Sequence, residues 1–164
     1  MFKKTAIALG LLGAMLSAQA ATYNFNGLID AGPQAGQTFS GQFSFSDAAV
    51  SGSGFETPAL LSFSLSFLGQ NYSLGSATGT PTADHQDGVF LGLSYQFSSP
   101  TQTLVFTSGS FDLSDAYLHF TPVGGLESSG SYTISAVPEP STWALSLAGL
   151  LAVGAIARRR QAQA

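Results

Sequence analysis

The sequence predicts an all-β domain, an antiparallel β-sandwich or jelly roll of about eight strands, and two observations indicate it. Apolar and polar residues alternate along several short segments, as in FSGQFSFS at 39–46 and LLSFSLSFLG at 60–69. A period of two is typical of strands that bury one face. Glycine-rich turn clusters such as SGSG at 51–54 separate these segments at regular spacing, which favours antiparallel sheets.

Each expected strand follows from such an alternation between turn clusters. No stretch of the domain shows a sustained period of 3.6, so no helix is predicted there. We expect large apolar side chains to fill the space between two sheets, since aromatic residues are ordinarily buried. The predicted strands lie at about 22–29, 39–46, 60–69, 71–74, 88–97, 102–108, 111–120 and 130–136, and the predicted core comprises Phe43, Phe45, Phe63, Leu65, Phe67, Leu91, Leu93 and Phe106.

The first 20 residues are predicted to be a secretory signal peptide, here called the signal helix, that is not part of the domain. Lys3 and Lys4 precede a short apolar run, and the small-residue pattern A-Q-A follows it. The run is short for a membrane anchor, so the signal peptide is the preferred interpretation. The chain is therefore expected to leave the cytoplasm through the Sec machinery. The residues of the expected cleavage site are Ala18, Ala20 and Ala21.

The charge of the domain expected at 21–136 excludes several kinds of partner. This segment holds eight carboxylates and no Lys or Arg. Such a surface repels phosphate, so neither nucleic acid nor anionic lipid is an expected partner. The segment also lacks the cationic clamp of phosphoryl transfer and a Schiff-base lysine. The absence of Cys from the sequence excludes disulfides and a thiolate metal site.

The end of the sequence predicts a linker, a single transmembrane helix and a basic cytoplasmic tail. Two prolines make 137–142 an extended linker that cannot continue a strand. The uncharged apolar stretch 143–157 is the expected helix, and at 1.5 Å per residue it is about 22 Å long. That is short for a bilayer core of about 30 Å. The segment 158–164 follows, where Arg158, Arg159 and Arg160 mark the cytoplasmic side.

This tail resembles the PEP-CTERM sorting signal of Gram-negative bacteria. The run V-P-E-P-S-T-W, the Ala/Leu/Gly-rich stretch after it and the arginine cluster carry the resemblance. It implies an integral-membrane exosortase as partner, which is thought to cut near the P-E-P and release or transfer the protein to the cell surface. The residues that the resemblance implies for recognition are Val137, Pro138, Glu139 and Pro140.

Two looser similarities add little about activity. The stretches YNFNGLIDAGPQAGQTFSGQFSF and GVFLGLSY are similar to small β-domains that often precede such tails. The same kind of tail also ends some proteins called ice-binding. That label would not show an activity here, because ice binding by a β-protein needs a flat, repeated Thr array and Thr101-Gln102-Thr103 stands alone.

No catalytic residue and no cofactor are predicted, and the chain is not expected to be an enzyme. Asp84 and Asp87 are candidates for a hard cation such as Ca²⁺, but an acidic turn ending at Gly88 is the plainer interpretation. Asp112 and Asp115, three residues apart, would face opposite sides of an extended strand and not one another across a cleft, and a turn is the plainer interpretation. The two histidines are His85 and His119, and nothing in the sequence assembles either into a catalytic triad.

These features predict an exported, non-enzymatic protein of the cell surface or of the extracellular polysaccharide matrix of a biofilm. The domain is expected outside the cell, held for a time in the inner membrane and then sorted, with a structural or adhesive role. An alternative is a carbohydrate-binding module for exopolysaccharide, whose sugar platform needs coplanar exposed aromatic rings. Phe55, Phe90 and Tyr23 are the candidates for it. A secreted hydrolase is a further alternative.

Overall fold

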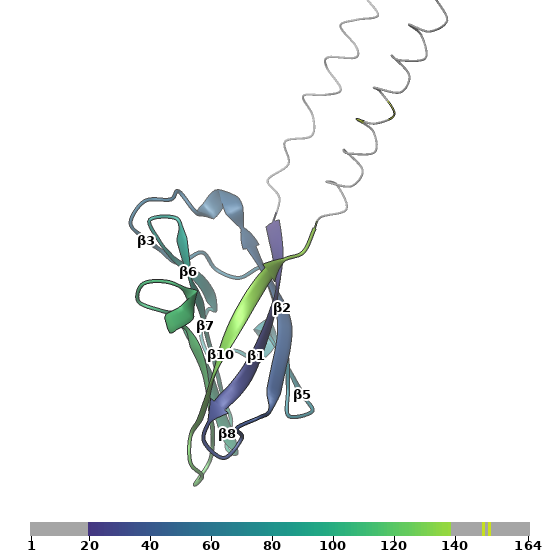
Figure 1. Cartoon of the computed structure of the whole chain (residues 1–164), viewed down its shortest axis with the longest axis vertical. Coiled ribbons are helices and arrows are strands. Elements are labelled where there is room, and N and C mark those ends of the chain that lie inside the picture. The colour runs from purple at the N-terminus through teal and green to yellow at the C-terminus, as the bar shows by residue number, and fades with distance from the viewer. Residues whose placement is uncertain (1–19, 139–148, 150, 152–164) are drawn as a thin grey trace, which may run out of the picture.

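The computed structural model describes residues 20–138, 149 and 151, and residues 20–138 form an antiparallel all-β domain (Figure 1). Three short 3₁₀ turns, η2 (Asp47–Ala49), η3 (Leu74–Ser76) and η4 (Leu113–Asp115), interrupt the strands. The strands of the described part are β1 (Ala20–Ala31), β2 (Thr38–Ser46), β3 (Phe55–Glu56), β4 (Ser62–Phe67), β5 (Gln70–Ser73), β6 (Thr82–Gln86), β7 (Val89–Ser98), β8 (Gln102–Thr107), β9 (Tyr117–Pro122) and β10 (Ser128–Ala136).

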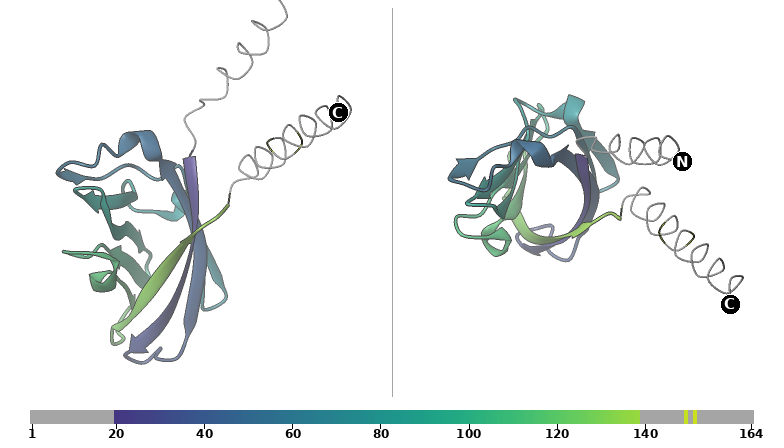
Figure 2. Two further views of the ribbon diagram at one scale, coloured as in Figure 1. Left: turned by 45° about the horizontal axis from the view of Figure 1, so that its top comes forward. Right: turned by 90° about the horizontal axis from the view of Figure 1, so that it is seen from above.

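The prediction of antiparallel β structure is confirmed, but the prediction of two separate sheets with about eight strands is wrong. Hydrogen bonds join ten strands of the described chain into one sheet, in the order β3-β6-β7-β8-β9-β10-β1-β2-β4-β5. This sheet curls around a single core, as Figure 2 shows from above. Two separate sheets are unnecessary, because the continuous sheet covers both sides of the core.

Strand β7 is the corner at which the sheet turns. Its first part, 89–94, pairs with β6, and its second part, 95–98, pairs with β8. Leu91 is an extra residue between the pairs Asp84↔Gly92 and His85↔Phe90, which makes a β-bulge. Bulges bend a strand and reverse its alternation. Phe90 therefore packs on the core while Val89 is exposed, the opposite of the simple alternation expected from the sequence.

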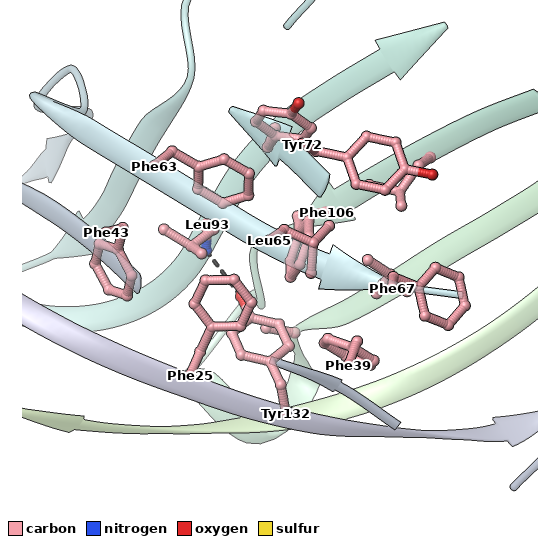
Figure 3. Packing of buried hydrophobic residues seen from close by; sticks show 14 of the residues in the cluster. Phe25, Phe39, Phe43, Phe63, Leu65, Phe67, Tyr72, Leu93, Phe106 and Tyr132 are labelled. Atoms are coloured by element: carbon pink, nitrogen blue, oxygen red, sulfur yellow. Dashed lines mark hydrogen bonds between the residues drawn. The ribbon is translucent and has the colours of Figure 1, made fainter. Parts of the chain in front are cut away.

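The alternation of β2 and β4 survives in the structure and supplies much of the core. The eight predicted core residues are all buried. Phe63 of β4 stacks on Tyr95 of β7 with ring centroids 4.2 Å apart, so it joins the two sides of the curled sheet. The alternation expected over 60–69 does not extend to Leu61. This side chain is 59% exposed, because it precedes β4 and is not part of the strand. Figure 3 shows the core around Phe63, with Phe43, Leu65 and Phe67 on the same two strands.

Two hairpins depend on residues in the left-handed region of backbone conformation. The β4–β5 turn has positive φ at Leu68 (50°) and Gly69 (72°), and the β6–β7 turn has it at Asp87 (50°) and Gly88 (81°). Positive φ at both central residues is what a two-residue type I′ turn requires. The neighbouring strands expected at 60–69 and 71–74 form the first of these hairpins, with Phe67 paired to Gln70.

Strand β6 was not expected, because the sequence of 79–88 resembles a polar turn cluster. It forms nevertheless, and it buries Ala83, Asp84 and His85. Its polar side chains find partners inside the protein, so a strand without apolar alternation is stable here. The interpretation of 83–88 as an acidic turn is therefore wrong for Asp84 and His85, and holds only for Asp87 and Gly88.

The first and last strands are neighbours, and β1 begins where β10 ends (Figure 1). Several predicted features lie outside the described residues: the signal segment 1–19, Glu139, Pro140, most of the apolar stretch 143–157, and Arg158 to Arg160. Within residues 20–138, 149 and 151, no helix has the length and apolar character needed to cross a membrane.

Candidate functional site

The junction between the domain and its tail is fixed by the sheet itself. Tyr23 of β1 pairs with Ala136 of β10, and the backbone N–H of Val137 donates to the carbonyl oxygen of Thr22 at 2.8 Å. Pro138 follows at once and has no backbone N–H to extend this pairing. The ladder therefore ends at Val137, and the P-E-P run starts where the folded backbone pairing stops.

The residues of the expected signal cleavage site lie at the same end of the sheet. Ala20 pairs with Ser46 and Ala21 pairs with Phe45, so both belong to β1. Ala18 lies outside the described residues. A cut before Ala21 would remove only the first pair of this ladder. The expected mature N-terminus and the start of the P-E-P run thus lie on adjacent strands.

Asp84 occupies a buried polar cluster and not an open metal site. Its carboxylate accepts hydrogen bonds from the hydroxyls of Thr82 (2.6 Å), Ser94 (2.5 Å) and Ser108 (2.7 Å). These donors come from β6, β7 and the segment after β8. Three hydroxyl donors stabilise a carboxylate that is only 4% exposed. The geometry gives Asp84 the role of tying these segments together.

The second candidate for a cation, Asp87, lies exposed in the β6–β7 turn. One carboxylate oxygen accepts from the backbone N–H of Gly54 and the other accepts from the Gln86 amide. These hydrogen bonds lower the pKa of Asp87, with that of Gln86 the larger cause. In the described part of the chain, no three His, Cys, Asp or Glu side chains are placed to hold a metal ion together.

Asp112 and Asp115 have different surroundings at the short turn η4. Asp112 accepts from both the backbone N–H and the hydroxyl of Ser114, which lowers its pKa. It therefore caps the turn. Asp115 is exposed, and its side chain accepts no hydrogen bond from the described residues. Asp112 is thus committed to the turn, whereas Asp115 is open to solvent.

The two histidines lie in separate parts of the molecule. His85 is buried between the rings of Phe45 and Phe90, and its Nδ1 lies 3.0 Å from the carbonyl oxygen of Ala83. His119 is partly exposed on β9, with Nδ1 2.8 Å from a carboxylate oxygen of Glu127. That second contact does not have the geometry of a hydrogen bond, so Nδ1 of His119 has no hydrogen-bond partner among the described residues.

The three aromatic side chains considered for a sugar platform do not share a surface. Tyr23 stacks on Phe43 and Phe45, and Phe90 stacks on Phe43, so both pack against the core. Phe55 is 61% exposed on the two-residue strand β3. An exposed platform is therefore not assembled from these residues.

The outer face of β9, β10 and β1 carries a surface hollow that the sequence did not indicate, here called the β10 hollow. Its volume is about 420 Å³. The middle strand contributes small residues, and the register places Ser129 opposite His119 and Ser131 opposite Tyr117. The side chains that give the hollow its chemistry are Asp30, Asp115, Tyr117, His119, Ser129 and Ser131.

Asp30 enters the β10 hollow through a second bulge. Ile29 pairs with Gly130 and Ala31 pairs with Ser129, which leaves Asp30 as the extra residue of β1. Bulges re-aim side chains and often lie beside functional sites. Sequence reasoning could not find this residue, because the bulge depends on pairing with a strand 100 positions away. Tyr117 and His119, two residues apart, lie in the strand that the sequence predicted at 111–120.

The comparisons with known proteins concern the tail. A family model matches at residues 136–161. These residues are a PEP-CTERM protein-sorting motif. The rest of the chain has no recognised family. No match was found among curated proteins or among solved structures.

The sorting motif confirms the resemblance seen in the tail sequence and begins at the last residue of β10. It implies an exported protein that an exosortase, a membrane protease, processes. Since the ladder ends at Val137, the sorting motif follows the sheet without an intervening spacer.

Proposed function

We propose that this chain is a non-enzymatic protein of the cell surface or of the extracellular polysaccharide matrix, with a structural or adhesive role. In this proposal the signal peptide directs export, and the helix at 143–157 holds the chain briefly in the inner membrane. Arg158 to Arg160 stay inside, and an exosortase then cuts near Pro138-Glu139-Pro140. The observation that carries the proposal is the PEP-CTERM sorting motif, which starts where the last strand ends.

The outer surface of the domain supports a role in a hydrated matrix. The outer faces of β2 and β4 carry neutral polar side chains, with Ser40 opposite Ser66 and Gln42 opposite Ser64. The domain has no Lys or Arg between residues 20 and 138. A surface of hydroxyls, amides and carboxylates remains solvated and is repelled by other acidic surfaces.

The hydrogen bonds and packing of three polar side chains support a non-enzymatic role. The carboxylate of Asp84 accepts three hydrogen bonds that hold the fold, and His85 packs between two aromatic rings. Asp112 caps a turn. A general acid or base must reach the proton that it transfers, and these groups are committed to the fold.

The test is the location of the protein in a host that contains an exosortase. Replacing Pro138-Glu139-Pro140 with three alanines should leave export intact and hold the protein in the inner membrane, because the signal peptide is unchanged and the cut is prevented. Pro33→Ala, at an exposed proline of the β1–β2 loop, is the control and should be sorted like the wild type.

The measurement is fractionation into inner membrane, cell surface and medium. Replacing the three arginines with neutral residues should instead blur the topology of the tail. If the triple-alanine variant reaches the surface or the medium as efficiently as the wild type, sorting does not depend on this motif and the proposal fails.

A further inference from the structure

We infer that the β10 hollow binds a neutral polysaccharide. This inference deepens the proposed surface role and rests on it, because it names the matrix component that the domain would hold. The argument begins with shape. Ser129, Gly130 and Ser131 form a floor of small residues, and larger side chains from β9, β1 and η4 stand on either side. A hollow of about 420 Å³ leaves room for a sugar ring.

The second step is the hydrogen bonding of the two carboxylates in the β10 hollow, Asp30 and Asp115. Glu56, Asp84, Asp87 and Asp112 all accept hydrogen bonds within the domain. By contrast, the side chains of Asp30 and Asp115 accept none from residues 20–138, and both are exposed. These two acceptors are therefore free to bind hydroxyl groups of a ligand, which form stronger hydrogen bonds to carboxylates than to neutral acceptors.

Tyr117 and His119 provide the apolar side that a sugar also needs. Their rings meet edge to face with centroids 4.3 Å apart, which holds Tyr117 in place beside the floor. Tyr117 is 37% exposed, so part of its ring is open to a ligand. An aromatic ring offers an apolar body and a polar hydroxyl together. A sugar ring has the matching combination of C–H groups and hydroxyls.

Charge decides between neutral and acidic sugars. The domain carries no Lys or Arg between residues 20 and 138, and Asp30 and Asp115 both face the hollow. A uronic acid or a sulfated sugar would bring a third negative charge to a hollow that holds two carboxylates and no Lys or Arg, and like charges at short range are unfavourable. The ligand class that fits the hollow is therefore an uncharged glycan.

The experiment measures binding of cellohexaose, laminarihexaose and maltohexaose by isothermal titration calorimetry. The full-length chain is used in a detergent without a sugar headgroup, and hexagalacturonic acid serves as the acidic comparison. At least one neutral hexasaccharide should bind, and hexagalacturonic acid should bind more weakly. Tyr117→Ala and Asp115→Asn should each weaken the binding about tenfold, as expected for the loss of one ring contact or one charged hydrogen bond.

Two control variants match these changes outside the β10 hollow. Phe111→Ala removes another exposed aromatic ring, and Asp47→Asn removes another exposed carboxylate. Both should bind within about twofold of the wild type. The circular dichroism spectrum and melting temperature of each variant establish that it is folded. A variant that is unfolded is replaced by Ser131→Phe, which should block the floor.

Several results would overturn the inference. It fails if none of the three neutral hexasaccharides binds, or if hexagalacturonic acid binds best. It also fails if the hollow variants bind like the wild type, or if the controls lose binding equally. Binding of Ca²⁺ that Asp30→Asn and Asp115→Asn abolish, without any sugar binding, would make the hollow a cation site instead. None of these outcomes bears on sorting by the P-E-P run, which the fractionation experiment tests separately.

Discussion

Removing the ring of Phe63 should cost about 4 kcal/mol of unfolding free energy, because this ring connects the two sides of the curled sheet. Phe63 is 5% exposed. Its centroid lies 4.2 Å from that of Tyr95, 5.9 Å from that of Phe25 and 6.0 Å from that of Phe106. Buried Phe→Ala changes cost about 3–5 kcal/mol, since they lose apolar contacts and leave a cavity. We expect a value within this range, because the surrounding rings belong to three strands and cannot all move inward.

The assay is urea unfolding of the full-length chain in detergent, followed by far-ultraviolet circular dichroism at 25 °C. With a slope of about 2 kcal/mol per molar urea, the midpoint of Phe63→Ala should fall by about 2 M. The matched control is Ser64→Ala on the outer face of the same strand, which should change the free energy of unfolding by less than about 0.5 kcal/mol. Comparable losses at both positions would refute the assignment of faces in β4.

Three further predictions concern the backbone, the buried carboxylate and pH. Gly92→Ala should destabilise the domain by about 2–3 kcal/mol more than Gly124→Ala in the same urea assay. Both glycines have positive φ, but only at Gly92 would a Cβ come within 3.1 Å of Ala116, Tyr132 and Ser108. Asp84→Ala should cost about 3 kcal/mol or more by leaving three hydroxyls without their acceptor, whereas Asp87→Ala at the exposed turn should cost clearly less. Burial raises the pKa of Tyr95 to about 12. The stability that the neutral Tyr95 contributes is therefore complete below about pH 10 and is lost as the pH rises towards 12. Absorbance at about 295 nm should show the ionisation of Tyr95 only as the domain unfolds. Ionisation of all five tyrosines near pH 10 in the folded protein would contradict this account.

The sequence was informative wherever one local rule determined the outcome. The alternation of β2 and β4 predicted which faces of these strands are buried, because the period of a strand is set by its own backbone. The P-E-P run, the apolar stretch and the arginines predicted the PEP-CTERM sorting motif, which the family match at 136–161 confirms. Both results depend on contiguous residues.

The predictions failed where pairing between distant strands overrides the local pattern. The bulge at Leu91 exists only because β7 pairs with β6, and it reverses the faces of Val89 and Phe90. Strand β6 itself could not be predicted, because Asp84 is buried by hydroxyls from distant segments. A single curled sheet in place of two sheets likewise depends on the pairing of β1 with β10.

The β10 hollow illustrates the same limit for a functional site. Asp30 is far in the sequence from Asp115 and Tyr117, and the three residues belong to no motif. Asp30 reaches the hollow through a bulge that only the β1–β10 register reveals. The aromatic residues that the sequence suggested for a sugar platform do not form one, because two of them, Tyr23 and Phe90, pack against the core.

The central claim is that the domain is exported and separated from its tail at the sorting motif. The most direct test is the intact mass, with sequencing of both termini, of the protein recovered from the surface or the medium of a host with an exosortase. We expect a chain that begins at Ala21 and ends near Pro138-Glu139-Pro140, with the β1–β10 ladder complete up to Val137. Recovery of a chain that begins at Met1, or one that keeps Arg158 to Arg160, would contradict the account.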